Sequence, residues 1–344
     1  MTQKPNPKSH PQSARRPHTR PPQDEGFKNR TRWLVAGTTA AILTGSALFN
    51  RARARRAEAE APPVGTFVEV DGVRLHYVDR GQGPVVVLLH GNGVMLQDFE
   101  VSGVLRLAAA NHRVIAFDRP GFGYSDRPRT TMWTPTAQAT LIAHALREIG
   151  VERAVVVGHS WGTIVALAMA LDHPDQVAGL VLLSGYYYGT ARPDVMTGAI
   201  PAIPVVGDVI ANTLSPLAGR LTGPAAVKAS FAPAPVSAKS ADLPKGMALR
   251  PSQMRATAAD TAMMVPGAVA ISGRYGELHV PVVVMAGDGD LIVHMDKHAE
   301  RLVKDIAGAE LRVVPGQGHM LHYAVPEQVV AAIDDVVRAG RESR

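Results

Sequence analysis

The stretch GHSWG at positions 158–162 has the residue types and spacing that could make a serine reactive. Ser160 lies between two glycines, where the β-branched run 154–158 gives way to a helical pattern from residue 161. A serine hydroxyl is a poor nucleophile unless a base removes its proton and donors stabilise the resulting oxyanion. We expect a sharp strand–turn–helix elbow that exposes Ser160, because side chains at Gly158 and Gly162 would clash in so tight a turn.

Candidate partners for this serine follow two later apolar runs. The run 282–287 leads into GDGD at 287–290, and the run 311–314 leads into GQGHMLH at 316–322. Asp288 or Asp290 could supply a carboxylate, and His319 or His322 could act as a base. Ser, Asp and His candidates therefore occur in this order along the chain.

Composition excludes several other kinds of chemistry. The 344-residue chain has no cysteine, so disulfides, thiolate metal sites and cysteine nucleophiles are ruled out. Residues 1–60 carry 12 Lys and Arg against 4 Asp and Glu, whereas residues 61–344 carry 24 against 26. Because the basic charge is confined to the N-terminal part, a nucleic-acid-binding face on the folded part is not expected. We also see no phosphate-binding fingerprint and no metal-ligand spacing, and so expect neither cofactor nor metal.

The N-terminal 63 residues divide into three segments. Residues 1–32 are predicted to be a disordered basic tail, residues 33–50 an uncharged apolar segment, and residues 51–63 a linker. The apolar segment could be a retained membrane anchor, a signal cleaved at a small-residue site such as 52–54, or a tail that never inserts. The basic residues before it predict a cytoplasmic N-terminus and an exported catalytic domain. We therefore expect a membrane-anchored protein, or a secreted one if the signal is cleaved.

From residue 66 onward, short apolar runs alternate with longer helical patterns, which is typical of a mostly parallel sheet covered by helices. We expect an eight-stranded α/β fold. The predicted strands are 66–70, 73–79, 85–90, 113–117, 154–158, 179–184, 282–287 and 311–314. The predicted helices lie near 97–109, 136–149, 161–172, 294–307 and 326–338. Residues 186–275 have no clear strand pattern and are predicted to form a helical insertion.

Residues 64–340 resemble the α/β-hydrolase fold family, in its branch of serine hydrolases with a cap. The resemblance rests on HGNG at 90–93, DRPGFGYSD at 118–126, the GHSWG elbow, and the two motifs that contain the candidate acid and base. It implies a core formed by residues 64–185 and 276–340, with residues 186–275 as the cap or lid. In this family the acid follows a G-x-x-D pattern, which selects Asp290, and the base is at the position of His319.

The resemblance also implies how the rest of the site is built. The backbone N–H groups of Asn92 and Trp161 would form the oxyanion hole. The substrate pocket would include residues from the oxyanion loop, the elbow and the start of the cap: His90, Gly91, His159 and Tyr186.

Related branches of the fold differ at defined positions. Asn92 and Trp161 are similar to the halide-binding pair of haloalkane dehalogenases, but those enzymes and the epoxide hydrolases need an aspartate at the position of Ser160. The elbow is similar to that of proline iminopeptidases, whereas HGNG departs from their H-G-G-P-G loop. Because the insertion is strongly apolar, we expect a carboxylic ester with an apolar acyl or ring group as the small-molecule substrate. Hydrolysis of a C–C or amide bond, perhydrolysis, and a non-catalytic ligand-binding role remain alternatives.

Overall fold

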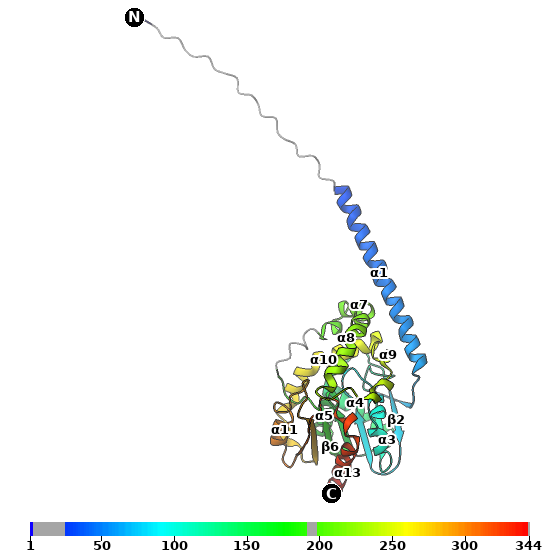
Figure 1. The fold of residues 1–344 in the computed structure, drawn as a ribbon, viewed down its shortest axis with the longest axis vertical. Helices are drawn as coiled ribbons and strands as arrows, with labels where there is room; N and C mark the ends of the chain where they lie inside the picture. Colours follow the sequence, from blue (N-terminus) through cyan, green and yellow to red (C-terminus); the bar gives the residue numbers. More distant parts are fainter. Residues whose placement is uncertain (3–24, 191–197, 343–344) are drawn as a thin grey trace. The chain divides into compact units, whose positions relative to one another are not determined.

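The structure is a computed structural model that describes residues 1–2, 25–190 and 198–342. The chain divides into two compact units, Met1–Gly45 and Ser46–Arg344. The tail predicted to be disordered at 1–32 lies mostly outside the described residues, and the chain is helical from Glu25 onward. The larger unit contains all the predicted site residues. Figure 1 shows its helices and strands.

One sheet forms the centre of the larger unit, with eight strands among the described residues in the order β1-β2-β4-β3-β5-β6-β7-β8. β1 and β2 form an antiparallel hairpin, β2 pairs antiparallel with β4, and the remaining pairs are parallel. The strands are β1 (Thr66–Val70), β2 (Val73–Arg80), β3 (Val85–Leu89), β4 (Arg113–Phe117), β5 (Ala154–His159), β6 (Val177–Leu183), β7 (Val282–Gly287) and β8 (Glu310–Val314). The predicted α/β fold with a mostly parallel eight-stranded sheet is confirmed.

Helices cover both faces of the sheet, because the parallel strands are apolar on both sides. In β3, Val87 and Leu89 belong to one core cluster, while Val86 and Leu88 belong to the other. The first cluster contains α4 (Pro135–Glu148), α5 (Trp161–Asp172) and α11 (Ala299–Asp305). The second contains α2 (Gln97–Ser102), α3 (Val104–Ala108), α12 (Leu321–Ala324) and α13 (Pro326–Glu342). The short turn Pro174–Gln176 joins α5 to β6.

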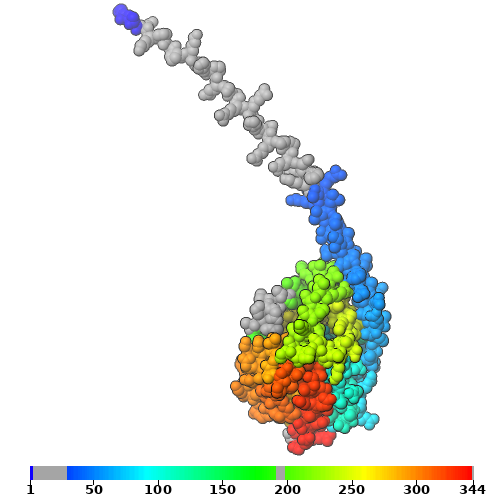
Figure 2. All heavy atoms as spheres, viewed as in Figure 1, coloured from blue at the N-terminus to red at the C-terminus, as the bar shows by residue number. Residues whose placement is uncertain are grey.

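The insertion between β6 and β7 is helical, as predicted, and no strand occurs in its described part, residues 198–275. Its helices are α7 (Val206–Thr213), α8 (Ser215–Phe231), α9 (Lys245–Ala248) and α10 (Pro251–Ser272). Short 3-10 turns lie at Ile200–Ala202, Ala238–Asp242 and Tyr275–Glu277. In Figures 1 and 2, α7 and α8 (green) lie together at one end of the larger unit.

The longest helix, α1 (Glu25–Glu60), contains the apolar segment 33–50 and continues beyond it. Residues 51–60, which we expected to be part of a linker, are helical, because alanine, arginine and glutamate are strong helix formers. Pro62 and Pro63 follow the helix and cannot continue it. By length and composition α1 is able to cross a membrane, although a signal sequence has the same features.

Candidate active site

Ser160 occupies a sharp turn between β5 and α5. Its backbone has φ 51° and ψ −116°, in the left-handed half of conformational space, which costs a non-glycine residue on the order of 1–3 kcal/mol. The turn requires glycine on both sides. A Cβ on Gly158 would lie 2.6 Å from the backbone of Gly162, and a Cβ on Gly162 would overlap the carbonyl oxygen of Leu89. The surrounding structure thus holds this serine in a strained conformation.

Ser160, His319 and Asp290 form one chain of hydrogen bonds. The Oγ of Ser160 lies 2.8 Å from Nε2 of His319, and Nδ1 of His319 lies 2.8 Å from Oδ2 of Asp290. Because a carboxylate only accepts, Nδ1 carries the proton and Nε2 accepts from the serine hydroxyl. The other oxygen of Asp290 accepts the N–H groups of Ile292 and Val293, at 2.8 and 2.9 Å. The acid is therefore fixed by its own loop.

The two alternative partners occupy different environments. Asp288 is the exposed acceptor of a 2.7 Å hydrogen bond from the backbone N–H of Gly316, so it closes a turn. His322 is fully buried, and its Nε2 lies 3.0 Å from Oδ2 of Asp98. Neither side chain has a hydrogen bond to Ser160 or His319 among the described residues.

The two predicted oxyanion donors belong to the elbow and to the loop after β3. Trp161 is the first residue of α5, so its N–H has no acceptor within the helix. Asn92 belongs to the loop after β3, next to Gly91. A Cβ on Gly91 would lie 3.2 Å from Cβ of Ser160, so this loop approaches the elbow closely.

The side chain of Asn92 has a different partner from the one its resemblance to the halide-binding pair implies. Its Nδ2 donates to the carbonyl oxygen of Thr257 at 3.1 Å and to Oγ1 of Thr261 at 3.0 Å, both on α10. The indole Nε1 of Trp161 is buried and has no hydrogen-bond partner among the described residues. The asparagine therefore ties the loop after β3 to α10 of the insertion.

Arg119 supports the loop after β3, and sequence reasoning did not select it. This fully buried side chain donates to the carbonyl oxygens of His90 and Gly91, at 2.8 and 3.0 Å, and pairs with Asp260 of α10 at 2.7 Å. Nδ1 of His90 donates to the carbonyl of Gly91 at 2.7 Å, while Nε2 accepts the backbone N–H of Arg119 at 3.0 Å. Burial, and then the charge of Arg119, holds the pKa of His90 well below its usual range, so the ring is neutral.

Asp118 explains the spacing of the DRPGFGYSD motif. Its Oδ1 accepts the N–H of Leu96 at 2.9 Å, and its Oδ2 accepts the N–H of Tyr124 at 3.0 Å and approaches Nδ1 of His76 at 2.7 Å. Gly123 has a φ of +51°, and a Cβ there would overlap the carboxylate of Asp118. The glycine leaves room for the carboxylate that organises this loop.

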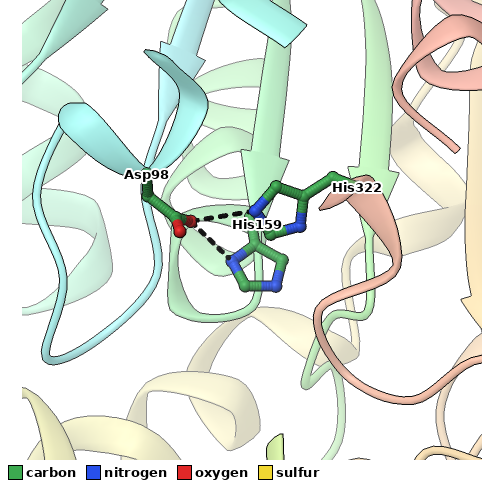
Figure 3. Close-up of side chains that lie close together, drawn as sticks. All are labelled: Asp98, His159 and His322. Atoms are coloured by element: carbon green, nitrogen blue, oxygen red, sulfur yellow. Dashed lines mark hydrogen bonds and ion pairs between the residues drawn. The ribbon is translucent and has the colours of Figure 1, made fainter. Parts of the chain in front are cut away.

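Figure 3 shows a second group of buried polar side chains, Asp98, His159 and His322. The ring centroid of His159 lies 5.2 Å from that of His319. Nε2 of His159 donates to the carbonyl oxygen of His319 at 3.1 Å. Asp98 accepts from His322 at 3.0 Å and from the hydroxyl of Tyr323 at 2.8 Å. Burial by itself raises the pKa of Asp98, but the nearby histidines and the tyrosine outweigh it and lower this pKa to about 2. Asp98 is therefore ionised, and it holds α12 beside the loop of His319.

Asp98, His159 and His322 also offer ligand atoms that all lie within 4.8 Å of one another. Imidazole nitrogens and carboxylate oxygens are ligands that bind Zn²⁺. The sequence did not indicate this group, because its members come from three distant segments and share no local spacing. The hydrogen bonds of Asp98 to His322 and Tyr323 satisfy that carboxylate without a metal.

Tyr186 has a structural partner at the start of the cap. Its hydroxyl accepts the backbone N–H of Thr190 at 2.9 Å, and its ring centroid lies 4.5 Å from that of His298. The side chain is 2% exposed. The predicted pocket residue is thus packed where β6 leads into the insertion.

Residues 84–324 match the family model described as the alpha/beta hydrolase fold. The chain therefore belongs to the α/β hydrolase fold family. Epoxide hydrolase 3 of Siraitia grosvenorii is 36% identical over 118 residues, which are 34% of this chain and 37% of that protein. The chain spans between 35% and 44% of the length of the first curated relatives that it matches.

Solved structures support the same fold. A thermophilic esterase from Thermogutta terrifontis has a TM-score of 0.62 at 22% identity, over 80% of this chain and 99% of its own. A membrane phospholipase A, described as a bacterial virulence factor, has a TM-score of 0.63 at 19% identity, over 92% of this chain and 99% of its own. At these identities the likeness defines the fold and leaves the substrate open.

Proposed function

We propose that this α/β hydrolase is a serine hydrolase that cleaves carboxylic esters through an acyl-enzyme. One observation carries the proposal. The Oγ of Ser160 is hydrogen-bonded at 2.8 Å to Nε2 of His319, and Asp290 holds the opposite nitrogen of that ring at 2.8 Å. A nucleophile, a base and a group that orients the base are thus within hydrogen-bonding distance of one another.

The reaction follows from these contacts. Oγ of Ser160 attacks the ester carbonyl carbon, and its proton passes to Nε2 of His319. Asp290 keeps the other proton on Nδ1 and stabilises the imidazolium. When the tetrahedral intermediate collapses, the C–O bond breaks and the alcohol leaves with the proton from Nε2. Water then repeats the sequence on the acyl-enzyme and releases the acid.

The oxyanion of each intermediate would accept hydrogen bonds from the backbone N–H groups of Trp161 and Asn92. Arg119 holds the carbonyls of the loop that contains Asn92, which keeps this loop rigid. Losing one oxyanion donor typically costs about 100- to 1000-fold in rate. Arg119 is thus proposed as a positioning residue for the oxyanion hole.

The identity of residue 160 favours acyl chemistry over the reactions of two related classes. Epoxide opening and dehalogenation through an alkyl–enzyme ester need a carboxylate nucleophile, and a serine cannot form that intermediate. The apolar cap favours an apolar acyl or ring group. Residues 198–221 contain one carboxylate, Asp208, and it is engaged by Arg129 and Arg255 at 2.7 and 3.0 Å.

The test is intact-mass labelling of the full-length protein with a fluorophosphonate. This reagent reacts only with an activated serine and needs no knowledge of the substrate. We expect one adduct on the wild-type protein and none on Ser160→Ala, followed by turnover of p-nitrophenyl esters that depends on acyl chain length. An adduct that persists in Ser160→Ala, or no adduct on the folded wild-type protein, would reject the proposal.

We further infer that α1 is a retained anchor and that the catalytic domain is exported. Side chains at the end of the apolar segment and beyond it are bonded into the domain, which a cleaved signal would not need. Nδ2 of Asn50 donates to the carbonyl oxygen of Thr213 at 2.9 Å, and Glu58 pairs with Arg250 at 2.9 Å. Cleavage within residues 52–54 would remove the first of these contacts.

Two measurements test the anchor. The mature protein should keep its N-terminus and remain in the membrane fraction after a carbonate wash. Alkaline phosphatase fused to the C-terminus should be active, because alkaline phosphatase folds only after export. A soluble mature protein that begins near residue 55 would replace the anchor with a cleaved signal.

A further inference from the structure

We propose that a basic pocket between α1 and the cap binds the phosphate headgroup of an anionic lipid. The pocket has a volume of about 310 Å³, close to the lower end of the range for small-ligand sites. Its lining includes four basic side chains, Arg53, Arg56, Arg220 and Lys245, and one carboxylate, Glu60. This proposal rests on the retained anchor proposed above.

Most of the positive charge in this pocket is not neutralised. Arg56 pairs with Glu60 at 2.7 Å. The described residues place no carboxylate within 4 Å of the charged groups of Arg53, Arg220 or Lys245. Three like charges around one small cavity repel one another, so the arrangement favours an anion. Guanidinium groups suit phosphate because they donate in pairs.

Neighbouring side chains orient Arg220 in the basic pocket. Its guanidinium lies 5.4 Å from the ring centroid of Phe49, and its Nη1 lies 3.4 Å from Oδ1 of Asn50. Asn50 is in turn held by the carbonyl oxygens of Asn212 and Thr213, at 3.0 and 2.9 Å. The cation is thus fixed at the junction of α1, α7 and α8, with N–H groups left to donate.

The position along α1 identifies the ligand as a lipid. The apolar segment ends at Asn50, and Arg53 follows three residues later, about 4.5 Å farther along the helix axis. When residues 33–50 span the hydrocarbon layer, the pocket lies at the depth of the headgroups. In Figure 1 the last turns of α1 run beside α9, and Ala57 belongs to one apolar cluster with Met247 of α9.

The outer surface of α8 fits the same membrane surface. Leu214, which precedes the helix, is 54% exposed, and Leu217 and Leu221 within it are 39% and 84% exposed. Exposed leucines are side chains that can insert among lipid acyl chains. The exposed leucines would give the cap an apolar contact with lipid beside the proposed headgroup site.

The test measures which lipids the protein retains. Full-length protein is incorporated into phosphatidylcholine vesicles with a minor fraction of phosphatidylglycerol, extracted in a neutral detergent, and analysed by mass spectrometry for bound lipid. We expect phosphatidylglycerol to be enriched over its bulk fraction. Arg220→Gln and Lys245→Gln should each lower the affinity about fivefold, as expected for one basic residue at a lipid surface.

Matched controls remove the same charge outside the pocket. Lys228→Gln changes the same helix as Arg220, and Arg55→Gln changes the same helix as Arg53; both side chains are exposed and neither lines the pocket. These controls should keep the enrichment, and all four variants should hydrolyse a soluble ester like the wild type. Equal loss in pocket and control variants would mean diffuse attraction to the surface and would overturn the site.

A second arm separates a lipid from a soluble phosphate. Inorganic phosphate and glycerol 3-phosphate are titrated onto the protein in neutral vesicles. Retained phosphatidylglycerol that these ions do not displace supports the lipid site. Binding of the free ions, sensitive to Arg220→Gln, without lipid enrichment would overturn the lipid assignment. Failure of the wild-type protein to remain in the membrane fraction would instead reject the anchor on which the proposal rests.

Discussion

The imidazole of His159 donates a hydrogen bond from Nε2 to the carbonyl oxygen of His319, at 3.1 Å. His159 immediately precedes the proposed nucleophile, and His319 is the proposed base. One bond therefore links the elbow after β5 to the loop after β8. His159 is 2% exposed and packs against His322, with ring centroids 4.3 Å apart and ring planes tilted by 52°. The alignment of His319 thus depends on His159, a buried side chain that we propose acts through its neighbours.

Replacing His159 should slow catalysis while leaving substrate binding intact. His159→Ala removes the donor to the His319 carbonyl, so we expect kcat to fall by up to about 100-fold with little change in KM, because small displacements of catalytic groups are costly. His159→Gln keeps an N–H donor of similar reach and should recover part of the rate. Steady-state kinetics on a p-nitrophenyl ester measures both. A rise in KM with unchanged kcat would contradict the positioning role.

Local patterns explain why the sheet and the proposed catalytic residues could be read from the sequence. Each strand is a short apolar run, and Ser160, Asp290 and His319 follow such runs in the loops at their ends. The buried polar side chains around these residues could not be predicted in the same way. Asp98, Arg119 and Asp260 acquire their roles only when distant loops meet, and their types are ones that usually lie on surfaces.

In the N-terminal region, the composition suggested a boundary where the structure has a continuous helix. The change from apolar to charged residues after position 50 suggested a boundary, yet Ala, Arg and Glu propagate the helix as well as the apolar residues do. The contacts of Asn50 and Glu58 with the cap depend on that continuous helix, and composition alone could not reveal them.

The two neighbouring aspartates after β7 should behave very differently on mutation. Asp290→Asn removes the acceptor that fixes Nδ1–H of His319, so we expect kcat to fall by about 10,000-fold. Asp288→Asn affects only the exposed hydrogen bond from Gly316 and should cost less than about 1 kcal/mol in stability with kcat nearly unchanged. Rates and urea unfolding curves of both variants provide the comparison. If Asp288→Asn had the larger effect on kcat, the assignment of the acid would be reversed.

A second matched pair tests the buried ion pair between cap and core. Asp260 bridges Arg119 at 2.7 Å and Arg127 at 2.9 Å and is fully buried, whereas Asp208 bridges Arg129 and Arg255 near the surface. Asp260→Asn leaves a buried guanidinium without its counter-charge and should cost about 3–5 kcal/mol in unfolding free energy. Asp208→Asn should cost less than about 1 kcal/mol. Equal losses in urea unfolding would show that burial does not govern these pairs.

Stability should fall as the pH drops below neutral, because two buried histidines stay neutral in the folded state. Burial is the main reason why the pKa values of His90 and His159 lie well below the usual 6.5. The charge of Arg119 lowers the pKa of His90 further, and His322 and His319 lower that of His159. Asp98 raises both pKa values, but by less. Below pH 6.5 the unfolded chain binds protons that the folded protein does not, so the unfolded state is favoured. Between pH 7 and 5.5 each histidine should remove about 1 kcal/mol of unfolding free energy.

Asp98 contributes to the pH dependence of stability in a lower pH range than the two histidines. Its folded pKa of about 2 lies below the ordinary value of 3.8, so its contribution is present above pH 4 and is lost only as the pH falls toward 2. Urea unfolding between pH 7 and 5.5 therefore isolates the histidines. His159→Gln should make the dependence on pH shallower, whereas the exposed control His294→Gln should leave it unchanged. The same slope in wild type and His159→Gln would mean that His159 takes up a proton in the folded protein.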